Sequence, residues 1–163
     1  MTKYFIAGIP GTGKTTLGNY LAKKRNFQHI NIEEGDYIHK VNNEKEKFIK
    51  ELVEEKKDIV ITWGFSAHIH YIDFVMKLKH AGYKLIWFDG DREAAFISFE
   101  NRERNESPET LAQTIEAFKI QVNSIDQFNI VGQINPIQIN TFNENHQYKP
   151  LDQIIAEIEN KNH

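Results

Sequence analysis

Gly8-Ile9-Pro10-Gly11-Thr12-Gly13-Lys14-Thr15 is the most informative stretch of this sequence. It matches the pattern G-x-x-x-x-G-K-[ST], the Walker A motif, at every fixed position. An apolar run, Tyr4-Phe5-Ile6-Ala7, precedes it, and Thr16-Leu17-Gly18-Asn19-Tyr20-Leu21 follows it. The motif therefore lies between a predicted strand and a predicted helix, which is the context that it requires.

These residues predict a phosphate-binding loop; the alternative is a glycine-rich turn before an ordinary helix. Glycines let the backbone curl so that consecutive N–H groups form an anion-binding concavity, and the unpaired N–H groups of the next helix add to it. The residues expected to bind nucleotide phosphates are Gly11, Thr12, Gly13, Lys14, Thr15 and Thr16. We expect Lys14 to reach the β- and γ-phosphates and the Thr15 hydroxyl to coordinate Mg²⁺.

The composition predicts one globular domain over residues 1–163. Apolar residues make up 40% of the chain and aromatic residues 12%, which is enough for a packed core. The 20 basic and 23 acidic residues give a net charge of −3. We therefore expect no bulk binding to nucleic acid or to an anionic membrane. The sequence carries no signal for an oligomeric state.

The absence of some residue types and patterns excludes several classes of site and of protein. The chain has no cysteine, which excludes disulfides, thiolate catalysis and cysteine-based metal sites. No apolar run approaches the length of a membrane span, and the first predicted strand leaves no room for a signal peptide before it. We therefore expect a cytoplasmic protein.

Short apolar or β-branched runs alternate with helical patterns along the chain. The predicted strands cover residues 4–7, 28–32, 58–62, 84–88 and 137–140. Amphipathic patterns predict helices that begin at Lys14, near Glu44, after Ser66, at Arg92, after the capping pair Ser107-Pro108 and at Pro150. This alternation predicts an α/β fold with three layers, in which helices cover both faces of a parallel sheet of about five strands.

Ligands of such sheets bind beyond the carboxyl ends of the strands, where carboxylates follow the second strand. Asp36 is the first candidate to accept the proton of an acceptor hydroxyl or to hold a Mg²⁺-bound water, and the alternative is an ordinary turn aspartate. Glu33 and Glu34 are weaker candidates for the same task. The third strand ends in Thr62-Trp63-Gly64 without an acid, which argues against motor ATPases and GTPases, because these hold Mg²⁺ there.

Two arginines follow the fourth strand. Arg102 is a candidate to close over the nucleotide phosphates, where its charge would stabilise the transition state. Arg104 is a weaker candidate, and for both the alternative is pairing with neighbouring glutamates. His68 and His70 would face different sides of a helix, so we expect no metal pair there. The aromatic residues Trp63 and Phe65 either line an acceptor pocket or pack in the core.

Several segments together resemble the small-molecule P-loop kinases, and within them the gluconate kinases and shikimate kinases. The phosphate loop is shared by that whole superfamily. Gly35-Asp36-Tyr37-Ile38-His39 resembles the Gly-Asp-x-Leu-His segment of gluconate kinases, which lies in the acceptor region. Ser66-Ala67 with Tyr71-Ile72-Asp73 resembles their Ser-Ala…Tyr-Arg-Asp segment, and Gly90-Asp91 followed by Arg102 resembles the opening of their lid. The order and spacing agree over about residues 4–104.

The resemblance implies a short lid, ATP and Mg²⁺ as cofactors, and phosphorylation of a hydroxyl on a small molecule. The expected catalytic residues are Lys14, Asp36 and Arg102, and the residues expected at the acceptor are Asp36, His39, Gly64 and Phe65. The basic residues of gluconate kinases are partly missing, with His68 and Ile72 after the third strand and Ser98 and Asn105 in the lid. These departures predict a less anionic acceptor than gluconate, or one held by His39, Lys40 and His68.

Two other functions stay open at this point. A nucleoside or nucleoside-monophosphate kinase is one, because Gly64-Phe65 matches the start of the Gly-Phe-Pro-Arg segment of adenylate kinases. The segment between Gly35 and His80 has no arginine, however, so a monophosphate acceptor would lack its usual clamp. The other is a nucleotide-binding module without catalysis, which the missing basic residues favour.

Overall fold

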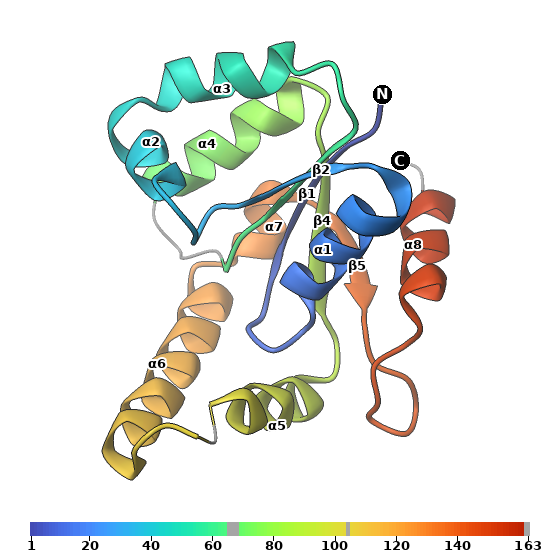
Figure 1. Ribbon diagram of the computed structural model, residues 1–163. Coiled ribbons are helices and arrows are strands. Elements are labelled where there is room, and N and C mark those ends of the chain that lie inside the picture. Colours follow the sequence, from blue (N-terminus) through green and yellow to red (C-terminus); the bar gives the residue numbers. More distant parts are fainter. Residues whose placement is uncertain (65–68, 104, 162–163) are drawn as a thin grey trace.

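A sheet of five parallel strands forms the centre of the computed structural model, which describes residues 1–64, 69–103 and 105–161 (Figure 1). The strands are β1 (Lys3–Gly8), β2 (Gln28–Asn31), β3 (Ile59–Thr62), β4 (Lys84–Asp89) and β5 (Ile137–Asn140). Their order across the sheet is β2-β3-β1-β4-β5. Phe5 of β1 is paired with Ile61 of β3 on one side and with Leu85 of β4 on the other. The predicted parallel α/β sheet is confirmed.

Helices cover both faces of this sheet (Figure 1). Their bounds are α1 (Lys14–Arg25), α2 (Tyr37–Asn43), α3 (Lys45–Glu54), α4 (Ile69–His80), α5 (Arg92–Arg102), α6 (Pro108–Gln127), α7 (Ile130–Ile134) and α8 (Leu151–Asn160). Within the described residues, no helix is long and apolar enough to cross a membrane.

The alternation of side chains along β1 divides the core into two layers. Tyr4 and Ile6 pack with α1 and α8, whereas Phe5 and Ala7 pack with the layer that includes α3, α4 and α7. All four side chains are buried. A strand buried on both faces must be apolar throughout, which is the pattern that the sequence showed.

Local signals set several helix ends as the sequence predicted. The Ser107 hydroxyl accepts a hydrogen bond from the Thr110 N–H at 3.2 Å, and Pro108 occupies the first position of α6. Helix α4 ends before Gly82, which has a φ of +98° and donates its N–H to Lys79 O at 3.0 Å. These are the N-cap and C-terminal glycine patterns that single residues can encode.

Two short helices, α2 and α7, have no counterpart among the predicted elements. In α2, Val41 is fully buried and the Tyr37 ring stacks on Phe48 of α3, with 5.9 Å between ring centroids. In α7, Ile130 and Ile134 are both buried. A helix of one or two turns is stabilised by such tertiary contacts rather than by its own sequence, so no local periodicity announces it.

We expect Phe74→Ala to lower the free energy of unfolding by about 3–5 kcal/mol, the usual range for deleting a buried aromatic ring. Phe74 is fully buried between Phe48, with which it stacks, and Trp63, which it meets edge-on. Urea denaturation measures the change. The control is Ile120→Ala on α6, where the side chain is 61% exposed and the expected change is below about 0.5 kcal/mol. Equal losses in the two variants would contradict this assignment of the core.

Candidate active site

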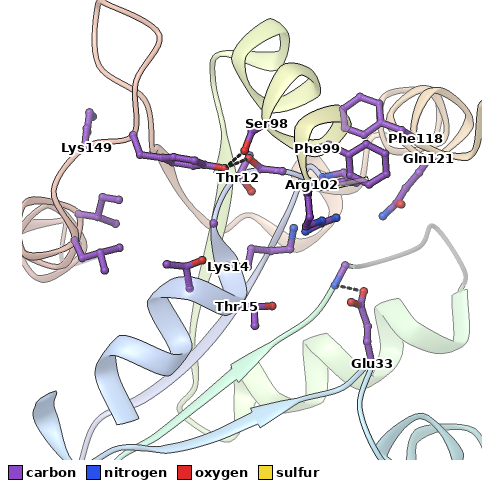
Figure 2. Close-up of a pocket in the computed structure, with 18 of the residues that line it drawn as sticks. Thr12, Lys14, Thr15, Glu33, Ser98, Phe99, Arg102, Phe118, Gln121 and Lys149 are labelled. Atoms are coloured by element: carbon purple, nitrogen blue, oxygen red, sulfur yellow. Dashed lines mark hydrogen bonds between the residues drawn. The ribbon is translucent and has the colours of Figure 1, made fainter. Parts of the chain in front are cut away.

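A cavity of about 670 Å³ lies at the carboxyl ends of the strands (Figure 2). Four parts of the chain line it: the phosphate loop with the start of α1, the ends of β2 and β3, one side of α5 and α6, and the loop before α8. Its lining includes all six residues that the sequence predicted to bind phosphates. This is the edge at which ligands of parallel α/β sheets bind.

The phosphate loop is held in a tight curve by its own backbone. Gly11 has a φ of +80°, and a Cβ atom there would overlap the carbonyl oxygen of Ala95 on α5. Gly13, at the N-cap of α1, has a φ of +87°. Glycine is the residue that accepts such backbone angles at no steric cost. The loop therefore packs so closely on α5 that a larger residue at position 11 would separate them.

Thr12 fixes the loop from inside. Its side chain is buried, and its hydroxyl donates to Ile9 O at 2.6 Å. The Thr12 carbonyl in turn accepts a hydrogen bond from the buried Thr141 hydroxyl at 2.9 Å. Because the Thr12 hydroxyl is engaged within the loop, its expected part in phosphate binding would fall to its backbone.

Lys14 lies at the bottom of the cavity with its ammonium group turned back onto the loop. Its Nζ donates to Gly8 O at 3.2 Å and to Ile9 O at 3.0 Å. Loss of hydration lowers the pKa of Lys14 to about 8, an effect that the Glu33 carboxylate opposes and the Arg102 charge reinforces. Lys14 is partly buried and forms no ion pair within the described residues, and a polyphosphate would supply an anionic partner.

Thr15 and Thr16 are exposed on the first turn of α1 and line the cavity. The Thr15 hydroxyl and the Glu33 carboxylate are oxygen ligands of the kind that Mg²⁺ prefers. Among the described residues, no three histidine or acidic side chains form a cluster that could hold a metal ion. The donor set thus fits a cation that shares its ligands with nucleotide phosphates, as expected for Mg²⁺.

The structure brings Glu33 to the cavity and places Asp36 elsewhere. Glu33 follows β2, and its Oε1 accepts a hydrogen bond from the N–H of Gly64, at the end of β3, at 2.9 Å. Asp36 is exposed at the start of α2 and, like the exposed His39, is absent from the described lining of the cavity. The expected roles of Asp36 and His39 stay predictions, and Gly64 does line the cavity.

Arg102, the last residue of α5, reaches into the cavity beside Lys14 (Figure 2). Its side chain is 62% exposed, lies 5.1 Å from the centroid of the Phe99 ring, and donates to Glu103 Oε1 at 3.3 Å. The ion pair predicted as an alternative therefore exists, but an exposed pair of this kind is worth little. Arg102 could leave it for a phosphate.

Of the remaining predicted residues, Trp63 and His70 are described by the structure and four others are not. Trp63 is buried and meets Phe5, Tyr71 and Phe74 edge-on, so of its two predicted roles the structure assigns it packing. His70 donates through Nε2 to Val41 O at 2.8 Å. Phe65, Ser66, His68 and Arg104 lie outside the described residues.

Sequence reasoning missed two parts of the cavity wall. One is a face of α6, made of Thr114, Ala117, Phe118 and Gln121, and the other is Tyr148 in the loop before α8. Phe118 is a buried apolar residue of a helix, and nothing in the sequence tied it to a site at residues 8–16. A tyrosine in a polar loop likewise carries no local signal of its neighbours.

Comparisons with known proteins agree with this geometry. The family model described as "ATPase family associated with various cellular activities (AAA)" matches residues 4–73. A protein of Pyrococcus abyssi named "Putative adenylate kinase" is 30% identical over 165 residues, which is 94% of this chain and 79% of that protein.

Solved kinase structures share the fold. A gluconokinase from Sinorhizobium meliloti 1021 superposes with a TM-score of 0.60 at 13% identity and covers 96% of this chain and 89% of its own. Shikimate kinase from Acinetobacter baumannii, in complex with shikimate, gives a TM-score of 0.57 at 16% identity. The match covers 99% of this chain and 96% of the shikimate kinase chain. The predicted resemblance to these two branches is confirmed for the fold.

We expect the affinity for ATP to fall as the pH rises above about 8. The free Lys14 ammonium loses its proton near that pH, whereas a bound polyphosphate stabilises the charged form and raises its pKa. Binding at pH 9 must therefore take up a proton that binding at pH 7 does not. Calorimetry in two buffers of different ionisation heat measures the uptake. Lys14→Met removes both the affinity and the proton uptake, and a flat affinity between pH 7 and pH 9 would contradict the assignment.

Proposed function

Because this chain belongs to the P-loop kinases, the family of its Pyrococcus relative, we propose that it transfers the γ-phosphate of ATP to a hydroxyl group of a small molecule. The observation that supports the hydroxyl acceptor best is the Glu33 carboxylate, oriented by the Gly64 N–H within the cavity that the phosphate loop lines. A carboxylate in that place is suited to take a proton and unsuited to meet an anion.

The proposed reaction uses five groups of this chain. Backbone N–H groups of the phosphate loop and the Lys14 ammonium bind the β- and γ-phosphates, and Glu33 accepts the proton of the acceptor hydroxyl. The hydroxyl oxygen forms a bond to the γ-phosphorus while the bond to the β–γ bridging oxygen breaks, which leaves ADP. Arg102 lies where its charge would stabilise the transferring phosphoryl group. Bound Mg²⁺ would neutralise charge on the phosphates, with Thr15 as its ligand.

Helix α6 supports an acceptor of low charge. Its four cavity-lining residues, at positions 114, 117, 118 and 121, share one helical face by their spacing, and none of them carries a formal charge. A hydroxyl, an amide and an aromatic ring suit a neutral polar molecule better than a sugar acid. The basic residues of gluconate kinases that this sequence lacks likewise favour an acceptor that is less anionic than gluconate.

We expect Glu33→Gln to lower kcat by about 100-fold or more, the usual contribution of a general base. The glutamine keeps an oxygen that can accept the Gly64 N–H, so the loop geometry is preserved while the basicity is lost. Asp36→Asn is the comparison, because sequence reasoning favoured Asp36 for this role. Single-turnover ADP formation measures both variants. If the loss occurs in Asp36→Asn and not in Glu33→Gln, the base is Asp36.

A nucleoside-monophosphate kinase is the second candidate, because the relative from Pyrococcus abyssi is named as an adenylate kinase. We expect neutral nucleosides or sugars, more than AMP, gluconate or shikimate, to stimulate ADP release at least about 10-fold over the background with ATP alone. A coupled ADP assay with each acceptor class measures this. Stimulation by AMP alone would establish the second candidate. Tight ATP binding without stimulation by any acceptor would identify a binding module.

A further inference from the structure

The loop between β5 and α8, residues 141–150, lies across the phosphate loop, and we call it the strap. It closes on itself through hydrogen bonds from Lys149 N to Thr141 O at 2.9 Å and from Asn143 N to Gln147 O at 2.7 Å. The Tyr148 ring stacks on the buried Phe142 ring, with 4.6 Å between centroids. The aromatic ring of the strap is therefore fixed in place from behind.

The Tyr148 hydroxyl contacts two different elements at once. It donates to the carbonyl oxygen of Gly11 in the phosphate loop, and it lies 2.6 Å from the Ser98 hydroxyl of α5 (Figure 2). A phenol has one proton to donate. Since Gly11 O can only accept, Tyr148 gives its proton to Gly11 and accepts the proton of Ser98. The three groups thus form a directed chain from α5 through the strap to the phosphate loop.

Both ends of this series of hydrogen bonds lie close to the groups of the proposed reaction. On the loop side, a Cβ atom at Gly13 would lie 3.4 Å from the Tyr148 ring, so the ring covers the N-cap of α1. On the helix side, Ser98 and Arg102 are four residues apart and share one face of α5. The rotation of α5 that pairs Ser98 with Tyr148 is also the rotation that turns Arg102 into the cavity.

A second contact ties the strap to the start of α5. His146, at a φ of +61°, bonds through Nδ1 to Asp91 Oδ2, and Asp91 Oδ1 caps the helix by accepting from Ala94 N at 3.0 Å. The strap thus contacts α5 at its N-cap and near its middle, whereas the last turn, which carries Arg102, packs on α6 through Phe99 and Phe118.

We propose that Tyr148 is a positioning residue, which sets the phosphate loop and Arg102 in a fixed relation through Gly11 and Ser98. This inference rests on the proposed kinase function, in which Arg102 acts on the transferring phosphoryl group. Ser98 occupies a lid position where gluconate kinases carry a basic residue that this chain lacks. The serine binds the tyrosine instead, and the helix is oriented by the strap rather than by a direct contact with the nucleotide.

The test is a double-mutant cycle between Tyr148→Phe and Arg102→Ala, with kcat and the Kd of ATP measured for each variant. Tyr148→Phe keeps the ring and its stacking and removes only the hydroxyl. We expect it to lower kcat about 5- to 10-fold, the equivalent of one hydrogen bond of about 1 kcal/mol. In the Arg102→Ala background the same change should lower kcat less than about 2-fold. Ser98→Ala should reproduce the fall in kcat with a smaller effect on ATP binding.

Tyr20→Phe is the matched control. The Tyr20 hydroxyl bonds to Asp152 Oδ1 at 2.9 Å, which likewise joins α1 to a distant element, and Tyr20 is not part of the described cavity lining. Its removal should leave kcat unchanged. Equal, additive losses for Tyr148→Phe in both backgrounds would overturn the proposal, because a merely structural tyrosine does not couple to Arg102.

Hydrogen exchange separates this proposal from the kinase assignment. We expect Tyr148→Phe to increase exchange in residues 8–13 and 92–102 of the ATP-bound protein, and Ser98→Ala to do so in 92–102 alone. Neither readout needs an acceptor. If no acceptor is phosphorylated but exchange rises as described, the proposed function fails and the linkage through Tyr148 holds. Unchanged exchange in both variants would overturn the linkage itself. If Tyr148→Phe does not fold, the hydrogen exchange of residues 92–102 in Ser98→Ala tests the linkage.

Discussion

The desolvated ammonium group of Lys14 is the constraint on which the rest of the structure depends. The Lys14 ammonium is partly buried against the carbonyls of Gly8 and Ile9, and its loss of hydration lowers its pKa to about 8. The fold maintains this arrangement because the phosphate loop is fixed between β1 and α1 and packed against α5 at Gly11. A polyphosphate would give the Lys14 ammonium an anionic partner, and the loop geometry that would receive it is already formed in this structure.

The second constraint is the close approach of α5 to the phosphate loop. At Gly11 the loop has no side chain, and the Ala95 carbonyl occupies the space. Helix α5 follows β4, next to β1 in the sheet, so the topology delivers its N-cap to the rim of the cavity. The helix runs from this N-cap along the cavity to its last residue, Arg102. Strand order and one glycine thus determine where the arginine can reach, and the strap determines how the helix is rotated.

In the proposed function, the acceptor side of the cavity differs from the phosphate side in its chemistry. Carbonyls, N–H groups and cations line the region of the phosphate loop, whereas Glu33 and the uncharged face of α6 line the region beyond it. Chains named gluconokinase and shikimate kinase share the fold of this protein at 13% and 16% identity. At that distance the common part is the fold, and in the proposed function the specificity for an acceptor depends on this chain's own residues.

The sequence by itself determined the phosphate loop, the five strands and the parallel α/β architecture. These features are local: a motif in consecutive residues, apolar runs too short for helices, and caps such as Ser107-Pro108. Tertiary structure alone decided that Glu33 rather than Asp36 lies at the cavity, since the direction of a carboxylate after β2 depends on its contact with Gly64, just after β3. It also joined Tyr148 to Gly11, 137 positions away. Periodicity reports which face of an element is buried, but it carries no information about which distant segment lies against that face.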